Sequence, residues 1–196
     1  MQVDAQAMAV AAAGTIYAGT ERGVFRSTDR GAHWTLHTTG FPGQTSANGA
    51  SFVLSVAVAP AHPEIVFAGT SDGLAKSTDG GLTWSAVTEV PQSVQSVVFD
   101  PGDPDRVLAG TSNGLFRGTD GGATWERLGG DANPALGLTG AISQVLRHPA
   151  RPGTIYVSEL VNESPAVTRA LPGAPRKARR RRRSGAYVEE TQRREG

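Results

Sequence analysis

The amino-acid sequence predicts an all-β fold built from repeated four-stranded units. Its 196 residues include 25 glycines and 12 prolines and no long apolar periodic stretch, which favours short strands joined by tight turns. An octet that ends in tryptophan occurs three times, as STDRGAHW at 27–34, STDGGLTW at 77–84 and GTDGGATW at 118–125. An Ala-Gly-Thr triplet precedes each octet at a constant distance, which sets a repeat period of 50 and then 41 residues.

Each repeat is expected to contain four short strands. The first is apolar and runs into a proline-bearing turn, as in SVAVAP at 55–60 and SVVFDP at 96–101, and the second carries the Ala-Gly-Thr triplet. Asp72-Gly73 and Asn113-Gly114 then suit a type I′ turn, in which both central residues have positive φ. The third strand runs into the octet, and the fourth begins at the tryptophan. Four strands in about 40–50 residues are typical of a β-propeller blade.

A fourth copy of the repeat begins but does not finish. QVLRHP at 144–149 and TIYVSE at 154–159 match the first two strands, and no octet follows them. The sequence therefore predicts a propeller-like array of antiparallel blades, three complete and one partial. The blades are expected within residues 1–164, at about 1–40, 51–90, 93–130 and 140–161, and a separate tail at 165–196.

The predicted tail differs from the body in charge. Residues 1–165 carry nine Lys and Arg against fifteen Asp and Glu, whereas residues 166–196 carry ten against three, with Arg179 to Arg183 in a row. Such a run is expected to be disordered and to bind phosphate polyanions such as nucleic acid non-specifically. A nuclear signal, a solvated tail without a role, and a truncated or frame-shifted reading of a longer gene are the alternatives.

The octet is expected to be a structural turn. An aspartate can accept hydrogen bonds from nearby backbone N–H groups, a glycine allows positive φ, and a tryptophan buries a large apolar surface. The first copy departs from the pattern with Arg30 and His33, and the third with Gly118 in place of serine. The residues expected to form this turn are Ser27, Asp29, Gly31, Trp34, Ser77, Asp79, Gly81, Trp84, Asp120, Gly122 and Trp125.

With three octets in register, residues 7–160 resemble the Asp-box, or BNR, repeats of β-propellers. Sialidases, sortilin-type receptors, xyloglucanases and photosystem II assembly factors share this repeat. The runs AGTSDGLAKSTDGGLTW and AGTSNGLFRGTDGGATW resemble the assembly-factor and xyloglucanase style more than the sialidase style. The resemblance implies that the Asp-boxes are structural and lie on the face away from the ligand site, and that the array is part of a larger propeller or pairs with another chain.

The resemblance places ligand binding at the turns between second and third strands and at the blade connections 39–51, 89–93 and 129–140. A glycosidase would need two carboxylates there. The favoured interpretation of the available carboxylates is that they are solvated turn residues. Sugar sites usually offer flat aromatic rings, and Phe41 is the only aromatic residue in these segments. The carboxylates in question belong to Glu21, Asp72, Glu89 and Asp131.

A sialidase-like site would need an arginine cluster and a tyrosine nucleophile. Arg26, Lys76 and Arg117 share one position of the repeat, which indicates blade architecture. Tyr17 and Tyr156 stand in the second strand at the position of Phe67 and Leu108 and are expected in the core, and Tyr187 lies in the tail.

No metal, cofactor or catalytic site is expected. The histidines lack the spacing of a metal site, and the stretch DPGDPD lacks the pattern of a calcium loop and is interpreted as a turn. Phosphate-loop and dinucleotide-binding motifs are absent. The residues set aside on these grounds are His33, His37, His62, His148, Asp100, Asp103 and Asp105.

The leading hypothesis for function is a non-enzymatic module that binds protein or polysaccharide through the ligand-face loops. The alternative is the remnant of a secreted glycoside hydrolase of the xyloglucanase or sialidase sort. No membrane span and no signal peptide are expected in the chain as written, and the compartment stays open, although members of the resembled families are often secreted. Uncovered end blades also predict self-association, through Val10, Ile16 and Phe25 at one end and Val145, Ile155 and Val157 at the other.

Overall fold

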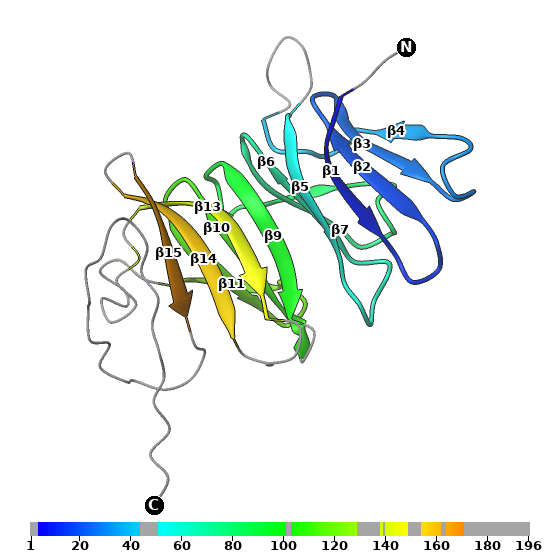
Figure 1. The fold of residues 1–196 in the computed structure, drawn as a ribbon. Helices are drawn as coiled ribbons and strands as arrows, with labels where there is room; N and C mark the ends of the chain where they lie inside the picture. Colours follow the sequence, from blue (N-terminus) through cyan, green and yellow to red (C-terminus); the bar gives the residue numbers. More distant parts are fainter. Residues whose placement is uncertain are drawn as a thin grey trace, which may run out of the picture.

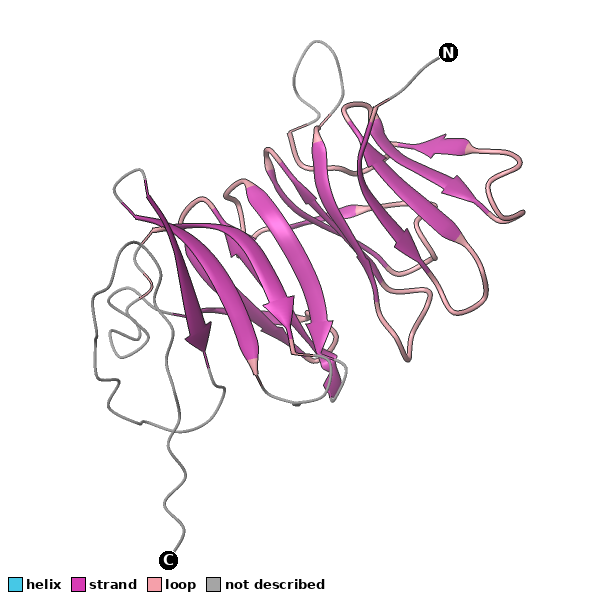
Figure 2. Ribbon diagram, in the orientation of Figure 1, coloured by secondary structure: helices cyan, strands magenta, loops and turns pink. Residues whose placement is uncertain are grey.

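A computed structural model describes residues 4–43, 51–100, 103–128, 138, 140–148, 154–161 and 164–170. The described residues form β-strands and loops without a helix (Figure 2), so none of them belongs to a helix that could cross a membrane. The strands make four separate antiparallel sheets, each a meander in which neighbours along the chain are neighbours in the sheet. The predicted all-β array of blades is thereby confirmed.

The sheets follow one another along the chain. The first contains β1 (Ala5–Val10), β2 (Ile16–Thr20), β3 (Gly23–Ser27) and β4 (Thr35–His37). The second contains β5 (Val53–Val58), β6 (Val66–Thr70), β7 (Gly73–Ser77) and β8 (Ser85–Val87). The third contains β9 (Val94–Asp100), β10 (Asp103–Thr111), β11 (Gly114–Thr119) and β12 (Thr124–Leu128). The fourth contains β13 (Ala141–Arg147), β14 (Ile155–Val161) and β15 (Ser164–Ala170).

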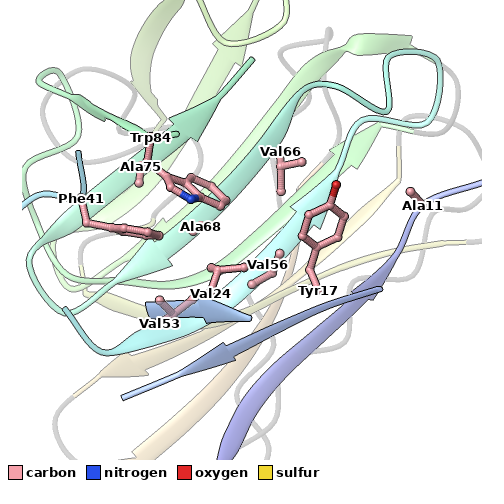
Figure 3. Close-up of a cluster of buried hydrophobic side chains, with 10 residues drawn as sticks. All are labelled: Ala11, Tyr17, Val24, Phe41, Val53, Val56, Val66, Ala68, Ala75 and Trp84. Atoms are coloured by element: carbon pink, nitrogen blue, oxygen red, sulfur yellow. The ribbon is translucent and has the colours of Figure 1, made fainter. Parts of the chain in front are cut away.

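The four sheets stand face to face as blades in an open row (Figure 1). The first strand of each blade contacts the first strand of the next, from β1 to β5 to β9 to β13. An apolar core fills each of the three spaces between blades. Figure 3 shows the core between the first two blades, with Phe41 and Trp84 side by side and Tyr17 at the other end of the cluster.

The glycine of the Ala-Gly-Thr triplet allows adjacent blades to approach closely. A Cβ on Gly19 would lie 2.6 Å from Cγ1 of Val53, which belongs to the first strand of the next blade. The same holds for Gly69, whose Cβ would lie 2.7 Å from the carbonyl oxygen of Val94, and for Gly110, at 2.7 Å from Cγ2 of Ile142. Distances this short leave no room for a side chain, so the close packing of adjacent blades explains why glycine recurs at this position.

The threonine of the triplet closes the hairpin that follows it. In the second blade, Thr70 Oγ1 donates to the carbonyl of Gly73 at 2.8 Å and accepts from the backbone N–H of Asp72 at 3.1 Å. Thr20 and Thr111 repeat both bonds. The type I′ prediction is wrong, because neither Asp72 nor Asn113 has positive φ. The two-residue loop begins one position earlier, and the threonine hydroxyl supplies the closure.

Two predictions about the fourth blade also need correction. β15 reaches Ala170, so the tail that was expected from residue 165 begins no earlier than residue 171, and residues 171–196 lie outside the described part of the chain. Val145, Ile155 and Val157, expected to be uncovered, are buried at 1%, 4% and 0% exposure in the core shared with the third blade. Strand alternation explains this, because these side chains point toward the preceding blade.

An ion pair joins the third and fourth blades. Arg147 on β13 donates through Nη2 to Oδ1 of Asp100 on β9 at 2.5 Å, and both side chains are almost fully buried. Arg106 extends the cluster by pairing with Asp103 at 3.2 Å. Asp100 ends β9, whereas Asp103 begins β10 and Asp105 follows within that strand, so two of the three aspartates stand in a strand and not in a turn.

Candidate functional site

The octet of the second blade forms a closed loop around the carboxylate of Asp79. Oδ1 accepts hydrogen bonds from Ser77 Oγ at 2.7 Å and from the backbone N–H groups of Leu82 and Thr83 at 3.0 and 2.9 Å. Oδ2 accepts from Thr83 Oγ1 at 2.6 Å. Ser77 Oγ in turn accepts from the N–H of Gly81 at 2.8 Å. Both oxygens of this carboxylate therefore accept hydrogen bonds from within the loop, as a structural role requires.

The first octet repeats the arrangement with a histidine. Ser27 Oγ donates to Asp29 Oδ1 at 2.8 Å, and the same oxygen accepts from the N–H of His33 at 2.9 Å. Asp29 Oδ2 lies 2.6 Å from His33 Nδ1, in the place that Thr83 Oγ1 takes in the second octet. Both His33 and Asp29 are solvent-exposed.

The third octet is built differently, and Asp120 does not have the expected role. Its carboxylate accepts no hydrogen bond within the described residues, and its φ is 53°. β11 and β12 instead pair up to Thr119 and Thr124, whose hydroxyls lie 2.6 Å apart, and a tight backbone turn joins them. The cause is Gly118: with no serine hydroxyl there, nothing organises the aspartate. The predicted start of the fourth strand at the tryptophan is off by one residue in every blade that has an octet: β12 begins one residue before it, and β4 and β8 begin one residue after it.

The pKa values of the two organised aspartates follow from this geometry. Burial acts to raise the pKa of Asp79, but the hydrogen bonds from Thr83, Ser77 and Leu82 outweigh it and lower the value from 3.8 to about 2. The backbone N–H of His33, followed by its side chain and by Ser27, holds the pKa of Asp29 well below its ordinary value. Both shifts favour the ionised form, which is the form that accepts hydrogen bonds.

The three tryptophans are covered to different extents. Trp84 is 6% exposed and packs against Phe41 with ring centroids 4.8 Å apart. Trp125 is half-buried and meets the Phe67 ring edge-on at 5.8 Å. Trp34 is 38% exposed, because no described blade precedes the first. The second and third octets therefore pack against the blade before them, and the expected burial of the tryptophan depends on that neighbour.

The opposite ends of the blades carry the hairpins closed by threonine and the blade connections. Here Pro42, Gly43 and Val90 lie against the hairpin of the second blade: a Cβ on Gly43 would meet the Asp72 carboxylate at 2.5 Å, and Val90 accepts from the N–H of Leu74 at 3.2 Å. Asp72 itself accepts from Ser71 Oγ at 2.9 Å and stays exposed. We call this end of the array the hairpin face.

The candidate carboxylates are spread over the hairpin face. Glu21 lies in the first hairpin, Asp72 in the second, and Glu89 just after β8, where Thr88 Oγ1 donates to it at 3.2 Å. All three are exposed, and no hydrogen bond among the described residues joins one to another. Asp131 lies outside the described residues.

The aromatic residue that the sequence singled out on this face is buried, and another is exposed. Phe41 is 5% exposed and belongs to the core with Trp84. Phe52, just before β5, is 52% exposed, and its carbonyl accepts from the N–H of Ser71 at 3.0 Å. Phe52 lies one residue beyond the connection considered in the sequence. The sequence could have revealed Phe52 by comparison between repeats. The matching position of the third blade holds Ser93, whose carbonyl accepts the equivalent hydrogen bond from the N–H of Ser112, so an aromatic residue there is not required by the blade.

Among the described residues, the sialidase-type candidates do not assemble into a site. Lys76 lies over the Phe67 ring at 5.6 Å, and burial lowers its pKa. Arg117 pairs with Glu126 on the neighbouring strand. Arg26, at the same repeat position, pairs in the β2–β3 and β3–β4 ladders.

The tyrosines and histidines also have structural surroundings. Tyr17 is 1% exposed in the core, while Tyr156 is half-buried and its ring centre lies 6.3 Å from that of His148. Tyr187 lies outside the described residues. His62 pairs with Glu64 at 3.2 Å, and His37 lies in β4. Within the described ranges, no three acidic, histidine or cysteine residues gather as a metal site would require.

Comparison with known proteins agrees with this geometry. The family described as "BNR/Asp-box repeat" matches residues 75–86, which hold the most complete of the three octets. The GH74 xyloglucanase from Xanthomonas campestris superposes on 84% of this chain with a TM-score of 0.65. The chain has the fold of β-propeller blades and carries an Asp-box repeat.

The solved structures that share this fold are distant in sequence. The Xanthomonas campestris enzyme is 20% identical, and the chain covers 28% of it. YCF48 from Cyanidioschyzon merolae is 14% identical, with a TM-score of 0.55 over 80% of this chain and 47% of its own. A structure of YCF48 bound to D1 peptide is 17% identical, with a TM-score of 0.60 over 89% of this chain and 55% of its own. No curated protein matches the sequence. The chain thus spans well under two thirds of these structures, and the likeness concerns the fold.

Proposed function

We propose that this Asp-box array is a non-enzymatic binding module that takes a protein segment on its hairpin face. The observation that carries the proposal is Phe52, a large aromatic side chain that is 52% exposed beside the second hairpin. The bond from Ser71 to its carbonyl fixes its backbone, so the ring is presented with little loss of conformational freedom on binding. Exposed aromatic residues of this kind are frequent anchors of protein interfaces.

The charges around Phe52 indicate the chemistry of the segment. Glu21, Asp72 and Glu89 are all exposed on the same face, and residues 1–165 as a whole carry a net negative charge. A segment with an apolar side chain next to Lys or Arg would complement both features, since cations also bind favourably on aromatic rings. The likeness to a YCF48 structure that contains a bound peptide supports protein as the ligand class.

A glycoside hydrolase remnant is the second candidate, favoured by the likeness to a GH74 xyloglucanase. Its mechanism would require one carboxylic acid and one carboxylate across a glycosidic bond. Glu21, Asp72 and Glu89 are the described residues that could supply them. Against this candidate, each is exposed and none is hydrogen-bonded to another, whereas a catalytic pair is usually held in a shaped cavity.

The test is a binding measurement with matched variants. The chain is screened on an array of random peptides, and the best binders are titrated by fluorescence anisotropy against wild type, Phe52→Ser and Leu82→Ser. Leu82 is a fair control because it is 45% exposed but lies in the octet, at the far end of the blade. Phe52→Ser should weaken binding about tenfold or more, the usual effect of losing an aromatic anchor, whereas Leu82→Ser should not.

Two results would contradict the proposal. One is a set of peptides that bind Phe52→Ser as tightly as wild type, or that are acidic and not basic. The other is turnover of xyloglucan or of aryl glycosides by the wild-type chain that disappears in Glu21→Gln, Asp72→Asn or Glu89→Gln. The second result would favour the hydrolase candidate.

A further inference from the structure

The exposed apolar side chains of the array gather at its two ends. On the first blade, Met8, Val10 and Trp34 are 63%, 66% and 38% exposed, and we call the surface that they form the leading face. On the fourth blade, Leu146 and Leu160 are 52% and 49% exposed. Among the described residues, the only other large hydrophobic side chains with such exposure are Phe52 and Leu82.

The second apolar surface lies on the side of the fourth blade that points away from the third. Ile155 and Val157 of β14 are buried against the third blade, so strand alternation places Tyr156, Ser158 and Leu160 on the opposite side. Leu146, paired with Tyr156, belongs to the same side. We call these four residues the trailing face.

The leading and trailing faces correspond to the two sides of the interface between adjacent blades, which the chain forms three times. Between the first and second blades, the Tyr17 ring lies beneath the octet of the second blade, where a Cβ on Gly81 would be 2.8 Å from it. Its hydroxyl donates to the Gly80 carbonyl at 2.9 Å. Phe67 lies beneath Gly122 of the third blade in the same way. At both of these junctions, the trailing side of one blade supplies a ring and the leading side of the next supplies a glycine loop.

Each end face is one unfilled half of that interface. On the leading face, a Cβ on Gly31 would meet only the ring of Trp34, so the space that Tyr17 occupies beneath Gly81 is open beneath Gly31. On the trailing face, Tyr156 occupies the repeat position of Tyr17, because it pairs with Leu146 as Tyr17 pairs with Ala9. A ring is present at one end and its receiving loop at the other.

The sizes of the side chains at positions 158 and 5 indicate which blade fits against the trailing face. Within the chain, Gly19 faces Val53 and Gly110 faces Ile142, each too closely for a Cβ. On the trailing face the glycine position is occupied by Ser158. A following blade with valine or isoleucine opposite would therefore collide with Ser158.

The leading face of this same chain carries the compensating residue. Ala5 pairs with Thr20 as Val53 pairs with Thr70, so Ala5 stands where the other blades have Val53, Val94 or Ile142. Alanine has no Cγ atom, and it is the Cγ atoms of Val53 and Ile142 that come closest to the glycines. The larger residue at 158 therefore matches the smaller one at 5.

We propose that two copies of the chain pair head to tail, with the trailing face of each on the leading face of the other. Both joints are then identical and related by a two-fold axis, and the assembly closes as one ring of eight sheets, four from each copy. Propellers of about 4–8 blades are the usual range, and closure protects the faces that the single chain leaves exposed.

The test changes the side-chain sizes at positions 5 and 158, first at one position and then at both. Sedimentation velocity of the whole chain over a dilution series should show a species of twice the 20.4 kDa chain mass. Ala5→Val places a branched side chain against Ser158 and should weaken the pair about tenfold or more, the effect expected of overpacking an interface. Adding Ser158→Gly to Ala5→Val recreates the Gly19–Val53 contact and should restore the pair.

Folding and association are kept apart in this test. Ala5 is exposed in the single chain, so circular dichroism of Ala5→Val under dissociating dilution should match wild type. A second variant, Leu82→Val, changes an exposed side chain away from both faces and should leave association unchanged. A monomer at all concentrations, a pair that ignores Ala5→Val, a double variant that fails to recover, or growth into open polymers would each overturn the proposal.

Discussion

The hydroxyl of Tyr17 in the first blade donates a hydrogen bond to the carbonyl of Gly80 in the octet of the second blade, over 2.9 Å. This bond joins two residues that are 63 positions apart and belong to different repeats. It shows that an octet closes its own loop and also receives the ring of the preceding blade. The octet is therefore a contact between blades as much as a turn within one.

The first prediction measures that contact between blades in the third octet. Gly121 and Gly122 are adjacent and both left-handed, with φ of 63° and 72°, so alanine at either should cost about 1–2 kcal/mol of backbone strain. A Cβ at Gly121 would meet only Ile65, at 3.6 Å, whereas one at Gly122 would enter the Phe67 ring. Gly122→Ala should therefore cost about 1–3 kcal/mol more than Gly121→Ala, measured by urea unfolding. Equal losses would mean that the ring moves aside freely.

A second prediction separates the two kinds of octet. Asp79→Ala should lower the free energy of unfolding by about 1 kcal/mol or somewhat more, because it removes the acceptor of the Leu82 and Thr83 N–H groups, which are exposed enough for water to replace it in part. Asp120→Ala should cost less than about 0.5 kcal/mol, since that carboxylate accepts no hydrogen bond within the described residues. Urea unfolding of both variants gives the comparison. A loss at Asp120 as large as the loss at Asp79 would show that the third octet is organised in solution like the second.

The third prediction is the pH dependence of the Asp79 loop. Its pKa is about 2 in the folded chain against an ordinary 3.8, so the folded state binds the proton less tightly than the unfolded state does. The stabilisation from the ionised carboxylate is then fully present above pH 3.8 and lost as the pH falls toward about 2. The difference in unfolding free energy between wild type and Asp79→Ala should be constant near neutral pH and shrink over that window. A difference that grows on acidification would contradict the assigned direction.

The sequence predicted the blades well because their signals are local and repeated. Octet, triplet and proline turn recur in register, and each marks one end of a strand. The type I′ prediction was wrong because the hydroxyl of Thr70, three residues from its partner, closes the hairpin without positive φ at Asp72. Nothing in the dipeptide Asp72-Gly73 distinguishes the two solutions; the threonine beside it does.

The parts that could not be predicted depend on neighbouring blades. Trp34 and Trp84 end octets of the same pattern, yet one is 38% and the other 6% exposed, because only Trp84 has a blade in front of it. Phe41 is buried and Phe52 is exposed on the hairpin face for a similar reason. The ring of Phe41 packs on Trp84 of another blade, whereas Phe52 contacts its neighbour through the hydrogen bond that its backbone carbonyl accepts from Ser71. Repeat position fixes which way a side chain points, and only the assembled fold fixes what covers it.

The last prediction concerns the end of the fourth blade. β15 pairs with β14 along its whole length, from Val161 with Ser164 to Ile155 with Ala170. Ending the chain after Val161 should lower the melting temperature by about 4 °C or more, since it turns β14 into an edge strand and removes a ladder worth a few kcal/mol. Ending it after Ala170 should leave the melting temperature unchanged and abolish salt-dependent binding to heparin, because Arg179 to Arg183 are then absent. Calorimetry and heparin retention of the two truncated chains check both halves, and a large loss of stability in the longer one would mean that residues 171–196 help to hold the blades together.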